Sequence, residues 1–121
     1  MTTQETAIRY HELANQRKFI EIQDHLYHED VVCQEPEKAA SMGLPVFTNG
    51  LEAIKAKGLA RRATIETVHG YTCSEPAVAG EFFSVVLKQE VTFKGKPRMT
   101  LEEFGIFHVK DGKVVKEQFF Y

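Results

Sequence analysis

The spacing of apolar residues changes from a helical to a strand period partway along the chain. In the first half, apolar residues such as Ala7, Tyr10 and Ala14 recur at intervals of three and four, which is typical of amphipathic helices. From Thr64 onward apolar residues tend to alternate with polar ones, which is typical of antiparallel strands. Helices first and strands afterwards predict an α+β fold, with three N-terminal helices on the concave face of a curved antiparallel sheet.

Capping and turn residues delimit these elements. Thr2 and Glu5 fit a capping box at the start of the first helix, which breaks near residues 15–18 before a second helix begins. Asn49 is expected to cap the third helix, and residues 37–48, which have no clean period, are interpreted as a loop or flap. Strands are expected at 31–35, 65–73, 82–93, 99–109 and 114–121, with Asp111-Gly112 as a two-residue hairpin turn.

Length, charge and cysteine content narrow the class of protein. The 121 residues suffice for one domain with a hydrophobic core, and we expect a single domain over residues 1–121. A net charge of −2 without a basic stripe argues against nucleic-acid binding, and no apolar run is long enough to span a membrane. Cys33 and Cys73 fit neither a disulfide framework nor a metal motif, which favours reduced thiols in a cytoplasmic protein.

Apolar side chains occupy both faces of the predicted sheet. In one strand Phe83 and Phe82 point to opposite faces, and in the next strand Phe107 and Phe104 do the same. A face in contact with water would alternate more cleanly, and aromatic residues on an open sheet would form a large apolar patch. This pattern favours a homodimer that pairs through the sheet; the alternative is a loosely patterned monomer.

Five strings in the second half of the chain carry a family resemblance. They are Val68-His69-Gly70, Ser74-Glu75-Pro76, Val91-Thr92-Phe93-Lys94-Gly95, Arg98-Met99-Thr100-Leu101-Glu102-Glu103 and the segment from Lys110 to Tyr121. With the order of elements, they resemble the SnoaL-like family of the nuclear-transport-factor-two-like superfamily, over nearly the whole chain. The resemblance implies a cystatin-like α+β cone with a mostly apolar pocket between sheet and helices, often paired back to back. That superfamily includes ketosteroid isomerases, polyketide cyclases, dehydratases and modules without catalysis, so function has to be argued from the pocket.

Glu35 is the main candidate for a catalytic base. It ends the string from Asp30 to Glu35 before Pro36, which is similar to the first-strand segment of ketosteroid isomerases, where an acidic residue before a proline is the general base. A carboxylate at the mouth of an apolar pocket is partly desolvated, and its raised pKa suits it to move a proton bound to carbon. The alternative is a solvated carboxylate on the rim, beside a turn.

Tyr10 and Glu103 are the candidates for stabilising an oxyanion. Tyr10 lies on the apolar stripe of the first helix and resembles the tyrosine that donates a hydrogen bond to the substrate oxyanion in those isomerases. Glu103 and Glu102 have opposite strand parity, so one of them faces the interior, where a protonated acid beside Tyr10 would complete the oxyanion site. The alternatives are a core tyrosine and a surface carboxylate paired with Arg98 or Lys88.

Further residues are expected to line the pocket and bind a ligand. His69 interrupts a strand-like stretch and Cys33 shares the strand parity of Glu35, while Phe83 and Phe107 are expected on the pocket face of the sheet. We expect no metal and no cofactor, because the chain has no paired zinc-ligand motif, phosphate-binding loop or serine elbow.

Two functions remain open at this point. The first is a pocket for a small apolar organic molecule with cofactor-free isomerisation, cyclisation or dehydration next to a carbonyl group, in which Glu35 is the base. The second is a non-catalytic ligand-binding or dimerisation module built on the same cone. The sequence leaves undecided whether Glu102 or Glu103 faces the pocket, and whether residues 37–48 form a lid.

Overall fold

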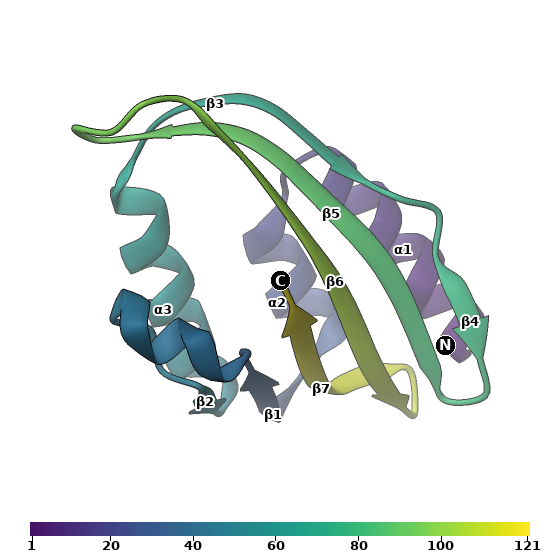
Figure 1. The fold of residues 1–121 in the computed structure, drawn as a ribbon. Helices are drawn as coiled ribbons and strands as arrows, with labels where there is room; N and C mark the ends of the chain where they lie inside the picture. Colours follow the sequence, from purple (N-terminus) through teal and green to yellow (C-terminus); the bar gives the residue numbers. More distant parts are fainter.

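One curved sheet of seven strands holds three helices against its concave face (Figure 1). The computed structural model describes residues 1–121. The strands are β1 (Tyr27–Gln34), β2 (Phe47–Asn49), β3 (Ile65–Cys73), β4 (Ala77–Ala79), β5 (Phe82–Phe93), β6 (Met99–Lys110) and β7 (Lys113–Phe120), in the order β2-β1-β7-β6-β5-β3 with β4 beside β5. All strand pairings are antiparallel except that of β1 with β7, which is parallel. A parallel pair cannot be connected by a hairpin, and here most of the chain lies between the two strands in the sequence. The α+β prediction is confirmed, with a mixed sheet in place of the antiparallel one.

The helices are α1 (Thr3–Asn15), α2 (Phe19–Leu26) and α3 (Leu51–Ala63). The predicted capping box is confirmed, because the Thr2 hydroxyl accepts from the Glu5 backbone and the Glu5 carboxylate accepts from the Thr2 backbone. The predicted break between the first two helices is also present, with Arg17 at a φ of 57°. This break lets α2 turn away from α1 and form one wall of the concave side.

The predicted cap of α3 is wrong. Asn49 belongs to β2, where it pairs with Val32, and the N-cap is Gly50 at a φ of 91° with no side-chain cap. Only glycine adopts such a backbone angle readily, so it makes the turn from strand to helix while its N–H donates to the Val31 carbonyl at 2.8 Å. The segment interpreted as a loop or flap, residues 37–48, contains the short 3₁₀ helix η1 (Glu37–Met42) and the start of β2.

The strand predictions from Thr64 onward agree closely with the structure. The bounds of β3 and β5 are those expected, and β6 and β7 differ from expectation by one residue at one or both ends. Asp111 and Gly112 both have positive φ, 50° and 76°, as a two-residue turn of type I′ between β6 and β7 requires. Because the strand bounds agree, the alternation along β5, β6 and β7 assigns their side chains to the inner or the outer face of the sheet.

The core lies where α1 and α2 pack on the inner face of β5, β6 and β7. Its aromatic centre is a cluster in which Phe83 and Phe107 stack at 4.7 Å and Tyr10 lies over Phe107 at 4.6 Å. Gly105 allows this packing, because a Cβ at that position would lie 2.8 Å from the Phe107 ring. The core therefore fills the end of the cone near α1 and leaves the end near α3 open.

The outer face of the sheet carries a patch of exposed apolar side chains from β5, β6 and β7, which we call the outer patch. It consists of Phe82, Val86, Phe104, Ile106 and Phe120. The strand register places Phe104 directly between Val86 and Phe120, so these side chains are contiguous. None of the helices has the length and apolar character needed to cross a membrane.

Candidate active site

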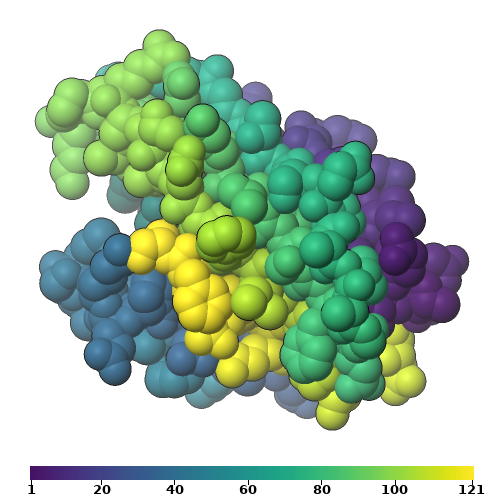
Figure 2. Space-filling view, turned by 45° about the vertical axis from the view of Figure 1, so that its right-hand side comes forward, coloured from purple at the N-terminus to yellow at the C-terminus, as the bar shows by residue number.

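A cavity of about 340 Å³ lies between the open end of the sheet and helices α2 and α3. Its apolar lining includes Phe19, Ile22, Leu44, Ile54, Leu87, Leu101 and Phe119. The molecular surface is indented between the β5–β6 hairpin and the η1 segment, beside the C-terminus (Figure 2). Met42 and Leu44, at and just after the end of η1, contribute to the cavity wall, so the segment at 37–48 covers part of the hollow.

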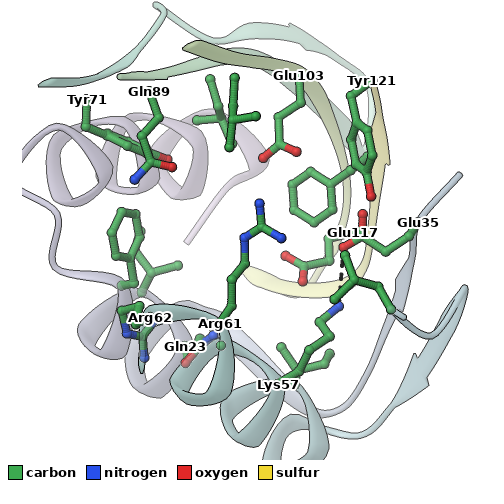
Figure 3. A pocket seen from close by; sticks show the side chains of 18 of the residues that line it. Gln23, Glu35, Lys57, Arg61, Arg62, Tyr71, Gln89, Glu103, Glu117 and Tyr121 are labelled. Atoms are coloured by element: carbon green, nitrogen blue, oxygen red, sulfur yellow. Dashed lines mark hydrogen bonds and ion pairs between the residues drawn. The ribbon is translucent and has the colours of Figure 1, made fainter. Parts of the chain in front are cut away.

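Glu35 faces the cavity and pairs with a lysine from α3. The Lys57 Nζ lies 3.4 Å from Glu35 Oε1, and the two side chains are 20% and 12% exposed (Figure 3). Lys57 also donates to the Cys33 Sγ at 3.1 Å. Burial raises the pKa of the Cys33 thiol, so Cys33 stays neutral and Glu35 is the ionic partner of Lys57. The candidate base is therefore fixed in place from the opposite wall.

The last strand contributes a phenol and a second carboxyl group. The Tyr121 hydroxyl lies beside Glu35 (Figure 3), and burial together with that carboxylate raises the pKa of Tyr121. Glu117 is 5% exposed and accepts a hydrogen bond from the Tyr27 hydroxyl. Burial raises the pKa of Glu117, which disfavours its charged form.

Glu103, and not Glu102, is directed into the cavity. Its carboxyl group points toward the centre (Figure 3), whereas Glu102 is 62% exposed and lies 3.5 Å from Lys88. Burial and then the charge of Glu35 raise the pKa of Glu103 to about 7, against the opposing effect of Arg61. A carboxyl group with this pKa exchanges its proton readily at neutral pH.

Tyr10 forms part of the cavity wall at the boundary with the core. It is 5% exposed, and its ring packs against Phe83 and Phe107. Burial raises its pKa well above the ordinary value, so it carries its proton and can only serve as a hydrogen-bond donor or acceptor. The structure thus brings Tyr10, Glu35 and Glu103 to one cavity.

The other residues expected at the pocket lie elsewhere. His69 is exposed on β3, and its Nε2 lies 2.7 Å from the Thr92 hydroxyl, outside the cavity. Phe83 and Phe107 are buried in the core behind Tyr10, and Cys33 is buried behind Lys57. His69 is placed outside because β3 reaches the cavity through Ile65 and Tyr71, not through the residues between them.

Several polar cavity residues escaped the sequence analysis, among them Lys57, Arg61, Glu117 and Tyr121. On α3, Lys57 and Arg61 follow the buried Ile54 at helical spacing, so they continue its stripe into the cavity. On β7 and just beyond it, Glu117, Phe119 and Tyr121 share one face. Charged residues that continue an apolar stripe are the signal that could have identified them.

Fold and cavity together define a class: a cone-shaped α+β domain with a largely apolar hollow that contains several ionisable groups. The profile of the SnoaL-like domain family matches residues 1–121, and the chain belongs to that family. The predicted resemblance is therefore confirmed.

Solved structures support this assignment. A Mesorhizobium loti protein named as a SnoaL-like polyketide cyclase shares 30% identity and a TM-score of 0.91, with 100% of each chain covered. An NTF2-like Burkholderia pseudomallei protein of unknown function shares 19% identity and a TM-score of 0.80, over 100% of this chain and 92% of that one. TerC, co-crystallised with polyporic acid, shares 21% identity and a TM-score of 0.79, over 99% and 92% of the two chains. No curated protein sequence matches the chain.

Proposed function

We propose that this protein binds a small organic carbonyl compound in the cavity and moves a proton next to the carbonyl group, without a cofactor. The observation that carries the proposal is the pair Glu35 and Glu103, two carboxyl groups that face one cavity in different environments. Glu35 is held in an ion pair with Lys57, whereas Glu103 has no cationic partner within ion-pair distance and its pKa is raised to about 7. Paired carboxyl groups in unequal environments are the usual basis of acid–base catalysis.

In this proposal each carboxyl group has one task. The Glu35 carboxylate takes the proton from the carbon next to the carbonyl, and the electrons of that C–H bond form the double bond of an enol. Glu103, in its protonated form, donates its proton to the carbonyl oxygen. Return of a proton from Glu35 to a different carbon, and of the enol proton to Glu103, completes an isomerisation. The Tyr10 hydroxyl, at the edge of the same cavity, is the further donor for the developing oxyanion.

The volume and lining of the cavity support a small ligand. A volume of about 340 Å³ lies at the lower end of the range for small-molecule sites, which is roughly 300–1,000 Å³. The neighbour TerC was crystallised with polyporic acid, an organic molecule, which fits the same kind of use for the fold. The two cysteines are free, in keeping with a cytoplasmic protein, which we also propose.

The test measures the isomerisation of a panel of β,γ-unsaturated cyclic ketones, which range in size from 3-cyclohexenone to bicyclic enones. The reaction is followed by the ultraviolet absorbance of the conjugated product. We expect turnover above the buffer rate, and a loss of at least about 100-fold in kcat/KM for Glu35→Gln. Glu102→Gln is the matched control, since the carboxylate of this neighbour of Glu103 is 62% exposed and pairs with Lys88. Equal rates for Glu35→Gln and the wild type would exclude Glu35 as the base.

A non-catalytic binding protein is the second candidate. It is favoured by the Lys57–Glu35 ion pair, because the Lys57 ammonium group already engages one oxygen of the candidate base. If no ketone turns over while small ligands bind in the cavity, this second function is the correct one.

We also propose that the outer patch is the contact between two copies of this chain. The patch is contiguous across three strands, and such aromatic surface on a sheet is usually covered. Lys88 and Glu102 pair at 3.5 Å on the same strands, and a two-fold axis through the patch would let them exchange partners. A second copy is therefore the occupant to which the surface is complementary.

A further inference from the structure

Arg61 is a charged side chain in the cavity with no charged partner. It extends from α3 toward the centre of the hollow, where the Glu103 carboxyl group points at it (Figure 3). The guanidinium takes part in no ion pair of the molecule. It makes a cation–π contact with Phe93, whose ring centroid lies 5.7 Å from the Arg61 Cζ. By contrast, Arg98 and Arg9 on the outer surface are both paired with glutamates. An arginine has five N–H donors, and those of Arg61 are free to bind a ligand.

The other charged groups of the cavity leave a positive balance. The charge of Lys57 is balanced by Glu35, Glu102 pairs with Lys88, and burial disfavours the charged form of Glu117. Arg62, the residue after Arg61, also lines the cavity and forms no ion pair. Glu103, with a pKa raised to about 7, carries only part of a negative charge at neutral pH. The charge of Arg61 is therefore incompletely neutralised by the protein. An unpaired guanidinium in a partly enclosed apolar hollow favours an anionic partner, most of all a planar carboxylate.

We propose that the ligand of this cavity carries a carboxylate, that Arg61 binds this group, and that Glu103 takes up a proton as the ligand binds. This inference rests on the proposed function, because it takes the cavity as the ligand site. It narrows the ligand from an apolar carbonyl compound to an apolar compound with one acidic group. Arg61 is a binding residue in this account.

Proton uptake follows from the groups that face Glu103. The titratable and charged groups of the cavity come from every wall: Tyr10 from α1, Tyr27 from β1, Glu35 just after it, Lys57, Arg61 and Arg62 from α3, Tyr71 from β3, Glu102 from β6, and Glu117 and Tyr121 from the C-terminal segment. Arg61 holds down the pKa of Glu103, and Glu35 raises it. A bound carboxylate adds a negative charge and engages Arg61, and both effects raise the pKa of Glu103 further. Binding above pH 7 therefore consumes a proton, so affinity falls as the pH rises above about 7.

The first test compares 2-naphthoate with 2-naphthamide, which have nearly the same shape and differ in charge, by isothermal titration calorimetry. The expected result is that naphthoate binds at least about 10-fold tighter at neutral pH, and that Arg61→Gln removes this preference. Arg98→Gln, the same change at an outer arginine, is the control and should keep it. Arg61 lines the cavity from the last turn of α3 and is still exposed to solvent, and the Arg98 side chain is 59% exposed, so neither substitution removes a buried side chain and we expect both variants to fold.

The second test measures the proton itself. Naphthoate binding at about pH 8, in buffers of different ionisation enthalpy, should show uptake of up to one proton in the wild type and none in Glu103→Gln. Equal affinity for the two probes, or a preference that survives Arg61→Gln, would overturn the carboxylate inference and leave the ligand site in place. Uptake unchanged in Glu103→Gln would overturn the role of Glu103. If neither probe binds at millimolar concentration, the ligand-site proposal fails as well.

Discussion

At the scale of single residues, the environment of Glu103 has a measurable consequence for stability. Its pKa of about 7, against an ordinary value of 4.5, means that folding favours the protonated form. The stability that this group contributes is complete below about pH 4.5 and is lost as the pH rises through about 7. The difference in pKa corresponds to about 3 kcal/mol at most.

Glu103→Gln should therefore become more stable relative to the wild type as the pH rises. The quantity to follow is the free energy of unfolding of the variant minus that of the wild type, measured by urea denaturation. We expect this difference to increase between about pH 4.5 and about pH 7 and to stay constant above that. Glu102→Gln, which removes a carboxylate that is 62% exposed and paired with Lys88, is the control. A gap that is flat with pH would mean that Glu103 is not desolvated in the folded protein.

At the scale of elements, a largely buried ion pair joins α3 to Glu35, the residue that follows β1. Lys57→Met should destabilise the fold by about 2 kcal/mol, because Glu35 is left as a largely buried carboxylate without a partner. The double variant Lys57→Met/Glu35→Gln should recover most of this loss, since it removes both charges. Thermal melts of Lys57→Met, Glu35→Gln, the double variant and the wild type distinguish this coupling from a simple loss of packing: additive losses would contradict it.

The elements also show what the sequence could and could not predict. The strands from Ile65 onward were predictable because alternation and the Asp111-Gly112 turn are local signals. The parallel pairing of β1 with β7 was not, because it joins distant segments. The start of α3 was misassigned because Asn49 is a good cap by residue type, while its pairing with Val32 holds it in a strand.

The candidate site shows a similar division. Strand parity predicted that either Glu102 or Glu103 faces inward and favoured an inward direction for Glu35, and helical periodicity put Tyr10 on the apolar stripe of the first helix; the structure selects Glu103. Lys57 and Arg61 lie on a helix whose charged residues would ordinarily face water, so their direction depends on how α3 closes the open end of the cone. Local patterns predict which face a residue occupies, and tertiary packing decides which faces meet.

At the scale of the whole molecule, the outer patch predicts the oligomeric state. We expect light scattering during size exclusion to give twice the chain mass of 13.8 kDa at micromolar concentration. Phe104→Asp, at the centre of the patch, should produce a folded monomer. Phe47→Asp is the matched control, because Phe47 is also exposed, at 59%, but belongs to β2 away from the patch. A wild-type monomer would contradict the proposed interface.

The most direct measurement for the cavity as a whole is the titration of its glutamate side chains by carbon NMR, with Glu103→Gln to assign the signal of Glu103. We predict one carboxyl group with a midpoint near pH 7 whose signal disappears in the variant. A midpoint for Glu103 near its ordinary value of 4.5 would mean that the hollow is open to water and does not hold a proton for chemistry at neutral pH.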